Sequence, residues 1–179
     1  MAIDELTDLV PPPDTPSEVP TRPRWTAIER KLGVSLPNDY KEYVSTYGSG
    51  LLGNFIIVAN PFSTNEGVEL FSVISMLCDA LRERLANEGQ DGVPFDIYPE
   101  IPGVLPWGGD ENGNGLYWLT EGTAEEWPCL VGAGRDSRWE RFEMPMTSFL
   151  TSALNGDVKC KIWPPAFARP KRRRAFVRY

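Results

Sequence analysis

The residues best suited to chemistry form the segment Asp110-Glu111-Asn112-Gly113-Asn114-Gly115, followed after five residues by Glu121. They match every fixed position of the calcium-binding loop, in which oxygen ligands surround the ion and a glycine permits a sharp turn. An EF-hand also needs flanking helices, whereas the twelve residues before Asp110 contain three prolines and three glycines, and Gly122 follows Glu121. Asn-Gly also supplies the positive φ angles of a hairpin turn. We therefore interpret the segment as a β-turn and expect neither a metal nor a cofactor.

Composition excludes several classes of enzyme. The 179 residues include no histidine, which rules out Ser-His and Cys-His nucleophilic pairs and histidine-ligated metals. The three cysteines, Cys78, Cys129 and Cys160, are too scattered for a zinc site or a disulfide framework. Adjacent carboxylates such as Glu125 and Glu126 could hydrolyse a glycosidic bond, but among 25 acidic residues such pairs also arise by chance. A solvated acidic face is the preferred interpretation, and a carboxylate-based hydrolase stays as an alternative.

Charge is unevenly distributed along the chain. The formal net charge is −7, but six of the 18 basic residues lie within the last eleven positions, so residues 1–168 carry 12 basic against 25 acidic side chains. Such a body repels phosphate backbones and attracts basic proteins. The basic tail could contact nucleic acid, an anionic membrane or the acidic body of its own chain. We expect a basic protein as partner, no membrane, and nucleic acid only through this tail.

The N-terminal sequence and the proline pattern suggest how the chain is divided. The acidic start is unlike a secretory signal and no run of 18 apolar residues occurs, so we expect a cytoplasmic protein. Residues 10–23 contain six prolines and are typical of an extended linker. The predicted divisions are a proline-rich arm over residues 1–23, a domain over 24–164 and a basic tail over 165–179.

Hydrophobic spacing predicts the elements of this domain. Apolar residues at helical intervals, with glycines after the last turn, indicate four helices, near residues 25–32, 37–47, 66–87 and 146–154. Short β-branched and aromatic runs indicate four strands, near residues 55–59, 116–120, 127–134 and 138–144. Helices that bracket a run of strands favour an α+β fold with a mainly antiparallel sheet.

A string of residues at the start of the domain resembles the opening signature of the SUKH superfamily. It runs Trp25, Ile28-Glu29, Leu32-Gly33, Leu36-Pro37, Asp39-Tyr40, Tyr43 and Tyr47-Gly48-Ser49-Gly50. Four later segments of the chain also resemble the family pattern: Pro106-Trp107-Gly108, Asp110 to Gly115, Leu116-Tyr117-Trp118 and Ser148-Phe149-Leu150. The resemblance covers about residues 24–156 and leaves out the arm and the tail.

The resemblance implies a SUKH-like α+β domain without catalytic activity. The superfamily includes the fungal cell-wall-assembly regulator domain and many bacterial immunity proteins, which bind and occlude a toxin. The acidic surface would suit fast capture of a basic toxin. For the contact surface we predict acidic loop positions and two tryptophans next to prolines: Glu100, Trp107, Asp110, Glu111, Glu121, Glu125, Glu126 and Trp127.

Two further functions stay open on the sequence. A regulatory or scaffolding module of the same fold could use the arm and the tail to contact several partners. The hydrolase would require a cleft between carboxylates. The sequence does not identify the partner, because one scaffold can present many different loops.

Overall fold

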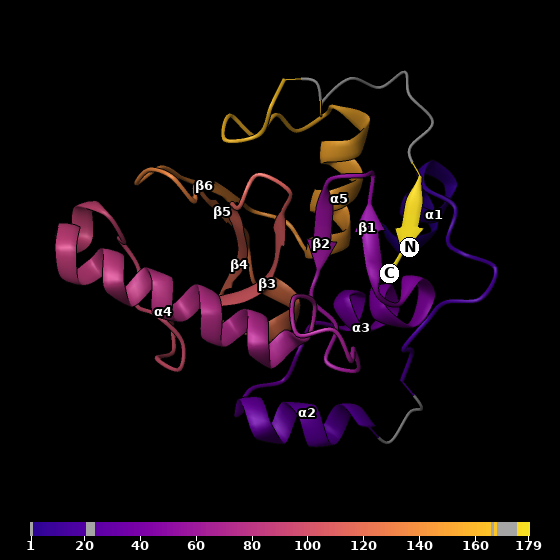
Figure 1. Cartoon of the computed structure of the whole chain (residues 1–179), viewed down its shortest axis with the longest axis horizontal. Coiled ribbons are helices and arrows are strands. Elements are labelled where there is room, and N and C mark those ends of the chain that lie inside the picture. Colours follow the sequence, from indigo (N-terminus) through magenta and orange to yellow (C-terminus); the bar gives the residue numbers. More distant parts are fainter. Residues whose placement is uncertain (1, 21–23, 166, 168–174) are drawn as a thin grey trace.

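The computed structural model describes residues 2–20, 24–165, 167 and 175–179 (Figure 1). The α-helices of this part are α1 (Ala2–Leu9), α2 (Arg24–Leu32), α3 (Asn38–Tyr47), α4 (Leu70–Glu88) and α5 (Met146–Asn155). The strands are β1 (Gly50–Leu52), β2 (Ile56–Val58), β3 (Val104–Asp110), β4 (Gly115–Leu119), β5 (Cys129–Gly132), β6 (Trp139–Phe142) and β7 (Phe176–Arg178). Short 3₁₀ turns occur at Gly89–Asp91 and Ala124–Glu126. The four helices and the four strands that the sequence predicts are all present.

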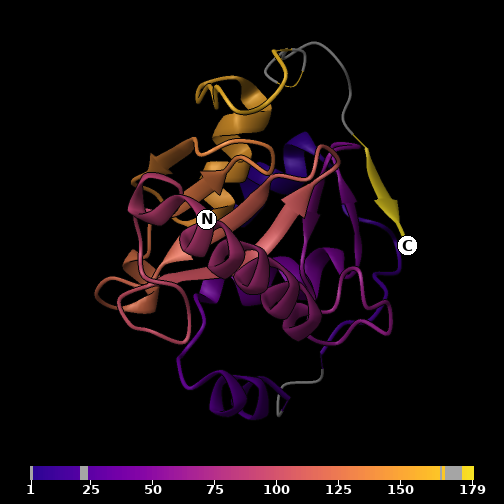
Figure 2. The ribbon, with the colours of Figure 1, turned by 60° about the vertical axis from the view of Figure 1, so that its left-hand side comes forward.

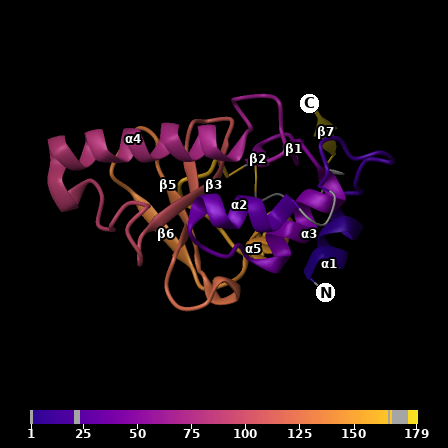
Figure 3. The ribbon, with the colours of Figure 1, turned by 90° about the horizontal axis from the view of Figure 1, so that it is seen from below.

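One antiparallel sheet holds these elements together, in the order β6-β5-β4-β3-β2-β1-β7. Helix α4 lies on one face and packs on β3, while α1, α3 and α5 pack together on the other face (Figure 3). Successive residues of β4 show this division, because side chains of a strand alternate between faces. Tyr117 lies beside Leu77 of α4, and the ring of Trp118 lies 5.1 Å from that of Tyr40 of α3. The α+β class with a mainly antiparallel sheet, predicted from the sequence, is confirmed.

The ends of the helices show why the helices form where they do. Helix α4 begins after Glu69, whose carboxylate accepts hydrogen bonds from the backbone N–H groups of Phe71 and Ser72 at 3.0 and 2.8 Å. Such a cap satisfies backbone donors that the first helical turn leaves free. Helices α3, α4 and α5 each end at a glycine with positive φ: Gly48, Gly89 and Gly156. A glycine there allows the chain to leave the helix without steric strain.

Strand β3 lies in a segment rich in proline and glycine where the sequence predicted no strand. The segment Val104-Leu105-Pro106-Trp107-Gly108-Gly109 forms the centre of the sheet and pairs with both β2 and β4. Its register with β4 shifts between Pro106 and Gly108, a bulge that accommodates a proline without an N–H donor. A Cβ at Gly108 would lie 2.2 Å from the Ile57 carbonyl oxygen, so only glycine fits there.

The N-terminal segment also differs from the predicted arm. Residues 2–9 form α1, and Ile3, Leu6 and Val10 are buried in the same core as α5. Residues 11–20 are extended, as the prolines indicate, but Ser17 forms a β-bridge with Gly48. This segment therefore packs against the domain, because one face of α1 is apolar.

The C-terminal tail contributes the last strand of the sheet. Strand β7 pairs with β1, and Arg178 lies within it. The basic run from Arg169 to Arg174, for which several contacts were considered, lies outside the described residues. In the part of the chain that the structure describes, no helix combines the length and apolar character needed to cross a membrane.

Candidate protein-binding surface

The predicted contact residues divide between two opposite ends of the sheet. Because the strands are antiparallel, Val104 pairs with Leu119 near one end, whereas Gly109 pairs with Gly115 near the other. The loops that carry Glu100 and Glu121 therefore meet at the first end, and the turn that carries Glu111 lies at the second. We call the first region, formed by residues 96–103, 120–126 and 143, the acidic end.

Hydrogen bonds fasten the two loops of the acidic end to each other. The backbone N–H of Thr120 donates to the Gly103 carbonyl oxygen at 3.0 Å. The N–H of Gly103 donates to Oγ1 of Thr120 at 2.8 Å, and that hydroxyl donates to the Gly103 carbonyl at 3.0 Å. Thr120 is buried, which protects these bonds from water. Two loops whose bonded residues are 17 positions apart in the sequence are thus held as one surface.

The acidic end carries far more negative than positive charge. Arg141 pairs with Glu121 at 3.0 Å and with Glu143, and Arg82 donates to the Tyr98 carbonyl at its margin. The hydrogen bonds to Glu143 and Glu121 raise the pKa of Arg141. Its exposed carboxylates are Asp96, Glu100, Glu121, Glu125, Glu126 and Glu143. Carboxylates gathered in this way create a negative potential that attracts cationic proteins.

Two of these carboxylates also serve the fold. Glu125 accepts a hydrogen bond from the backbone N–H of Asn38 at 3.1 Å, which places a negative charge at the start of α3. Glu126 accepts hydrogen bonds from Oγ1 and N–H of Thr123 at 2.9 and 3.2 Å, and these bonds lower its pKa. Charge changes at Glu125 and Glu126 would therefore disturb the loop as well as its potential, whereas Glu100 makes no such bond within the described residues.

An exposed aliphatic side chain, not predicted from the sequence, lies within the acidic end. Ile101 is 56% exposed and stands next to Glu100, two residues before the Gly103 that bonds with Thr120. A single exposed apolar residue is common on protein surfaces. Ile101 would gain from burial if a partner bound the charged loops around it. Asp96 and Glu143 of this surface were also not predicted.

The two predicted aromatic contacts are wrong. Trp107 is fully buried and Trp127 is 5% exposed, so neither can reach a partner. Both rings lie 6.0 Å from Trp118, and the three form a tryptophan cluster behind the acidic end. Their adjacent prolines indicated loops, but Trp107 lies on β3 and Trp127 directly after a 3₁₀ turn. The cluster supports the loops of the acidic end from within.

Asp110 is also removed from the predicted contacts, because it is 6% exposed and fully engaged in its own turn. Its Oδ1 accepts hydrogen bonds from the N–H groups of Asn112 and Asn114 at 2.9 and 3.1 Å. Its Oδ2 accepts one from the Asn114 side chain at 2.8 Å. The structure confirms the hairpin turn between β3 and β4 and shows that Asp110 stabilises it.

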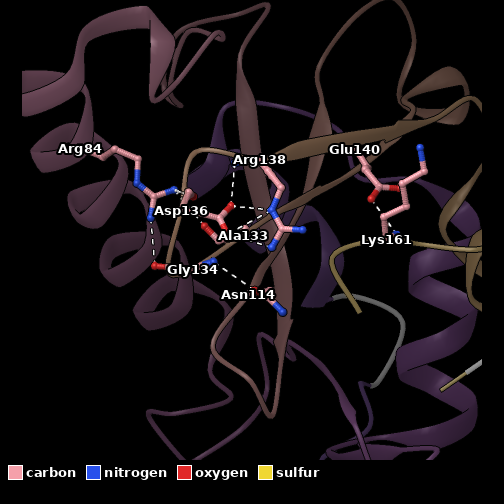
Figure 4. A network of polar contacts seen from close by, with 8 residues as sticks. All are labelled: Arg84, Asn114, Ala133, Gly134, Asp136, Arg138, Glu140 and Lys161. Carbon is pink, nitrogen blue, oxygen red and sulfur yellow. Dashed lines mark hydrogen bonds and ion pairs between the residues drawn. The ribbon is translucent and has the colours of Figure 1, made fainter. Parts of the chain in front are cut away.

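The same turn is joined to a second turn and to α4 (Figure 4). Oδ1 of Asn114 accepts a hydrogen bond from the Gly134 N–H at 3.1 Å. The Arg84 guanidinium donates to the carbonyl oxygens of Ala133, Gly134 and Asp136 at 2.8–3.0 Å. At the end of the sheet opposite the acidic end, a polar network thus holds the two turns and α4 together. Glu111 is exposed there, apart from the acidic end.

Replacing Asp110 by alanine should lower the free energy of unfolding by about 2–3 kcal/mol, because charge-assisted bonds inside the turn are lost. Chemical denaturation measures this change. Glu111→Ala, one position further along and exposed, is the matched control and should change stability by less than about 0.5 kcal/mol. If millimolar calcium instead raised the melting temperature of the unaltered protein relative to chelator, Asp110 would be an ion ligand.

Three cavities lie away from the acidic end. One of about 420 Å³ is lined by Trp163, Phe167 and their neighbours after α5. Two smaller ones, of about 130 and 100 Å³, adjoin Leu77 of α4 and Gly113. Asp110 is the one carboxylate lining these three cavities, and its oxygens are already engaged. Within the described residues, no group of three or more cysteine or acidic side chains could hold a metal ion.

Comparison with known proteins supports the resemblance seen in the sequence. The pattern of the family SUKH_6, described as SMI1-KNR4 cell-wall, matches residues 23–150, which run from α2 into α5. Searches of curated proteins and of solved structures gave no match. The matched region includes the whole acidic end and excludes α1 and β7.

Proposed function

The chain belongs to the SUKH family, and from this premise we propose that it is a non-catalytic binding protein of the cytoplasm that neutralises a basic toxin. The toxin would be bound at the acidic end and its active or substrate-binding surface covered. The family includes immunity proteins and cell-wall regulators, so membership supports a binding function. The kind of partner has to be inferred from the charge and exposed residues of the surface.

The acidic end is the observation that carries this proposal. The acidic end carries six exposed carboxylates and one exposed isoleucine, on loops joined by buried hydrogen bonds. Opposite potentials raise the rate of encounter between proteins, whereas affinity depends on a few apolar anchors that lose their water. The carboxylates would therefore set the association rate, and Ile101 would contribute the anchor.

Rigid loops make this surface suited to fast binding. Thr120 ties residues 96–103 to residues 120–126, and Glu125 and Glu126 fix the second loop through backbone donors. A surface that is already ordered loses little conformational entropy when its partner binds. The toxin would then meet a preformed negative face.

Co-expression with candidate toxins tests the proposed function directly. The chain should restore growth of cells that make its toxin, and the two proteins should purify together at moderate salt. Rescue without stable binding would contradict occlusion. Substrate turnover by the purified chain, lost when a single carboxylate becomes an amide, would support the hydrolase instead.

Charge reversal at Glu100 should slow capture of the toxin by about three- to tenfold in low salt, because steering depends on local potential. Stopped-flow association at about 10 and about 500 mM salt measures the effect, which should shrink at high salt. Glu111→Lys makes the same change in net charge at the opposite end of the sheet, and both residues are exposed. Equal slowing by the two variants would move the interface away from the acidic end.

A regulatory or scaffolding module is the second candidate. The description of the matching family as cell-wall favours this module. The segments before residue 23 and after residue 150, which the match leaves out, could contact further partners. Gene order separates the two: a neighbouring gene for a secreted protein with a variable C-terminal toxin domain favours immunity. A chain that rescues none of the neighbouring toxins but binds several unrelated proteins would favour the module.

A further inference from the structure

The C-terminal residues of the chain fill one edge of the sheet. Strand β7 lies along the outer edge of the sheet (Figure 2). It pairs antiparallel with β1, with Phe176 opposite Leu52 and Arg178 opposite Gly50. Further backbone bonds extend this pairing, from the Gly53 N–H to the Ala175 carbonyl at 3.0 Å and from the Tyr179 N–H to the Ser49 carbonyl at 3.4 Å. Without β7, the outer donors and acceptors of β1 would be free to bind another strand.

The β1 edge contains a recess that fits an aromatic ring. The Phe176 ring lies 5.1 Å from the ring of Tyr47, which is fully buried. The Tyr47 hydroxyl donates to the Val10 carbonyl at 2.7 Å and so fixes the floor of the recess. A Cβ at Gly50 would lie 2.3 Å from Cζ of Phe176, so the ring fits because position 50 has no side chain.

A second contact selects a basic residue two positions after the aromatic one. Nη1 of Arg178 donates to the carbonyl oxygen of Thr15 at 3.0 Å. Residues at this spacing lie on the same side of a strand. The strand that fills the β1 edge thus has the pattern aromatic, any residue, arginine, and its arginine contacts the adjacent N-terminal segment.

Strand β7 is held by few contacts. Val177 and Tyr179 are 48% and 51% exposed, and Phe176 is half-buried. Backbone hydrogen bonds contribute only about 0.5–1.5 kcal/mol each in water, and this strand spans three residues. Its place also lies outside the residues that match the family. Opening of β7 should therefore require much less free energy than unfolding of the domain.

We propose that the β1 edge is a strand-binding site, which the chain fills with its own residues 176–178 and which a protein partner can occupy by displacing them. The partner supplies an extended basic segment with an aromatic residue two positions before an arginine. Main-chain pairing gives affinity in such strand addition, and the aromatic recess gives specificity. This surface is separate from the acidic end and does not depend on the proposed toxin.

A labelled peptide of residues 175–179, Ala-Phe-Val-Arg-Tyr, tests the proposal on the full-length chain. The unaltered protein should bind it weakly, because its attached strand competes at a high effective concentration. Phe176→Ser should release that strand and bind the peptide at least about tenfold more tightly, as measured by fluorescence anisotropy. Equal binding by the two proteins, or binding by neither, would overturn the proposal.

Two controls show whether the recess is responsible. A peptide with serine in place of phenylalanine should not bind, and Gly50→Val added to Phe176→Ser should abolish binding because its side chain fills the recess. Binding that survives either change would contradict the proposed site. Amide hydrogen exchange at Gly53, which bonds to Ala175, should accelerate in Phe176→Ser. Unchanged exchange would show that Phe176 does not hold the strand, which also overturns the proposal.

Discussion

Replacement of Trp107 by alanine should lower the free energy of unfolding by about 3–5 kcal/mol, the usual cost of removing a buried tryptophan. Trp107 is fully buried at the centre of the sheet and its ring lies 6.0 Å from that of Trp118. In a domain of this length, such a loss should reduce the melting temperature by about 6–20 °C. Denaturant unfolding and thermal melts measure the change.

The control variant Trp107→Phe keeps an aromatic ring at this position and so tests whether the lost volume is responsible. Nε1 of Trp107 has no hydrogen-bond partner among the described residues, so phenylalanine removes no bond. Trp107→Phe should lower the free energy of unfolding by about 1–2 kcal/mol, much less than Trp107→Ala, because most of the ring volume is retained. If Trp107→Ala left stability unchanged, Trp107 would be an exposed residue, as the sequence first indicated.

The helices were predictable because their apolar residues follow the helical period. In α3, the buried residues Tyr40, Tyr43, Val44 and Tyr47 are spaced at three and four positions, and Gly48 follows at once. In α5, Phe149, Leu150, Ala153 and Leu154 behave in the same way. Such spacing is a local property, so a sequence alone displays it.

Strand β3 was not predictable in this way, because its local signals indicate a loop. Proline and adjacent glycines are rare within strands, yet Pro106 stands at a bulge and Gly108 lies against the β2 backbone. These residues are explained by the neighbouring strands, which are distant in sequence. The misplacement of Trp107 follows from the same cause.

The N-terminal helix carries the same kind of local signal as α3 and α5. Ile3, Leu6 and Val10 lie at helical intervals and are buried, but the prolines that follow them dominated the interpretation. In contrast, no local signal joins Glu100 to Glu121. They share one surface because β3 and β4 are antiparallel and because Thr120 bonds to Gly103. The acidic composition predicted that the protein has a negative face, but composition alone does not show which loops form it.

Replacing Ile101 by aspartate should weaken binding of the toxin by at least about 30-fold, because apolar anchors contribute about 2 kcal/mol or more to an interface. The substitution removes the apolar contact, and a carboxylate at the centre of an interface also loses its hydration when the partner binds. Ile101 is already 56% exposed in the free protein, so its stability should hardly change. Titration calorimetry or surface binding measures affinity, and a thermal melt checks the fold.

Met76→Asp provides the matched control for this prediction. Met76 is 60% exposed on α4, so the variant makes the same change of apolar side chain to carboxylate at similar exposure, away from the acidic end. It should bind the toxin as the unaltered chain does. If Met76→Asp weakened binding of the toxin and Ile101→Asp did not, the interface would lie on α4.

The two rate constants of binding should respond to different variants. Ile101→Asp should raise the dissociation rate, because that rate depends on anchor contacts, whereas Glu100→Lys should lower the association rate. Two variants at adjacent positions would then separate the apolar from the electrostatic part of the surface.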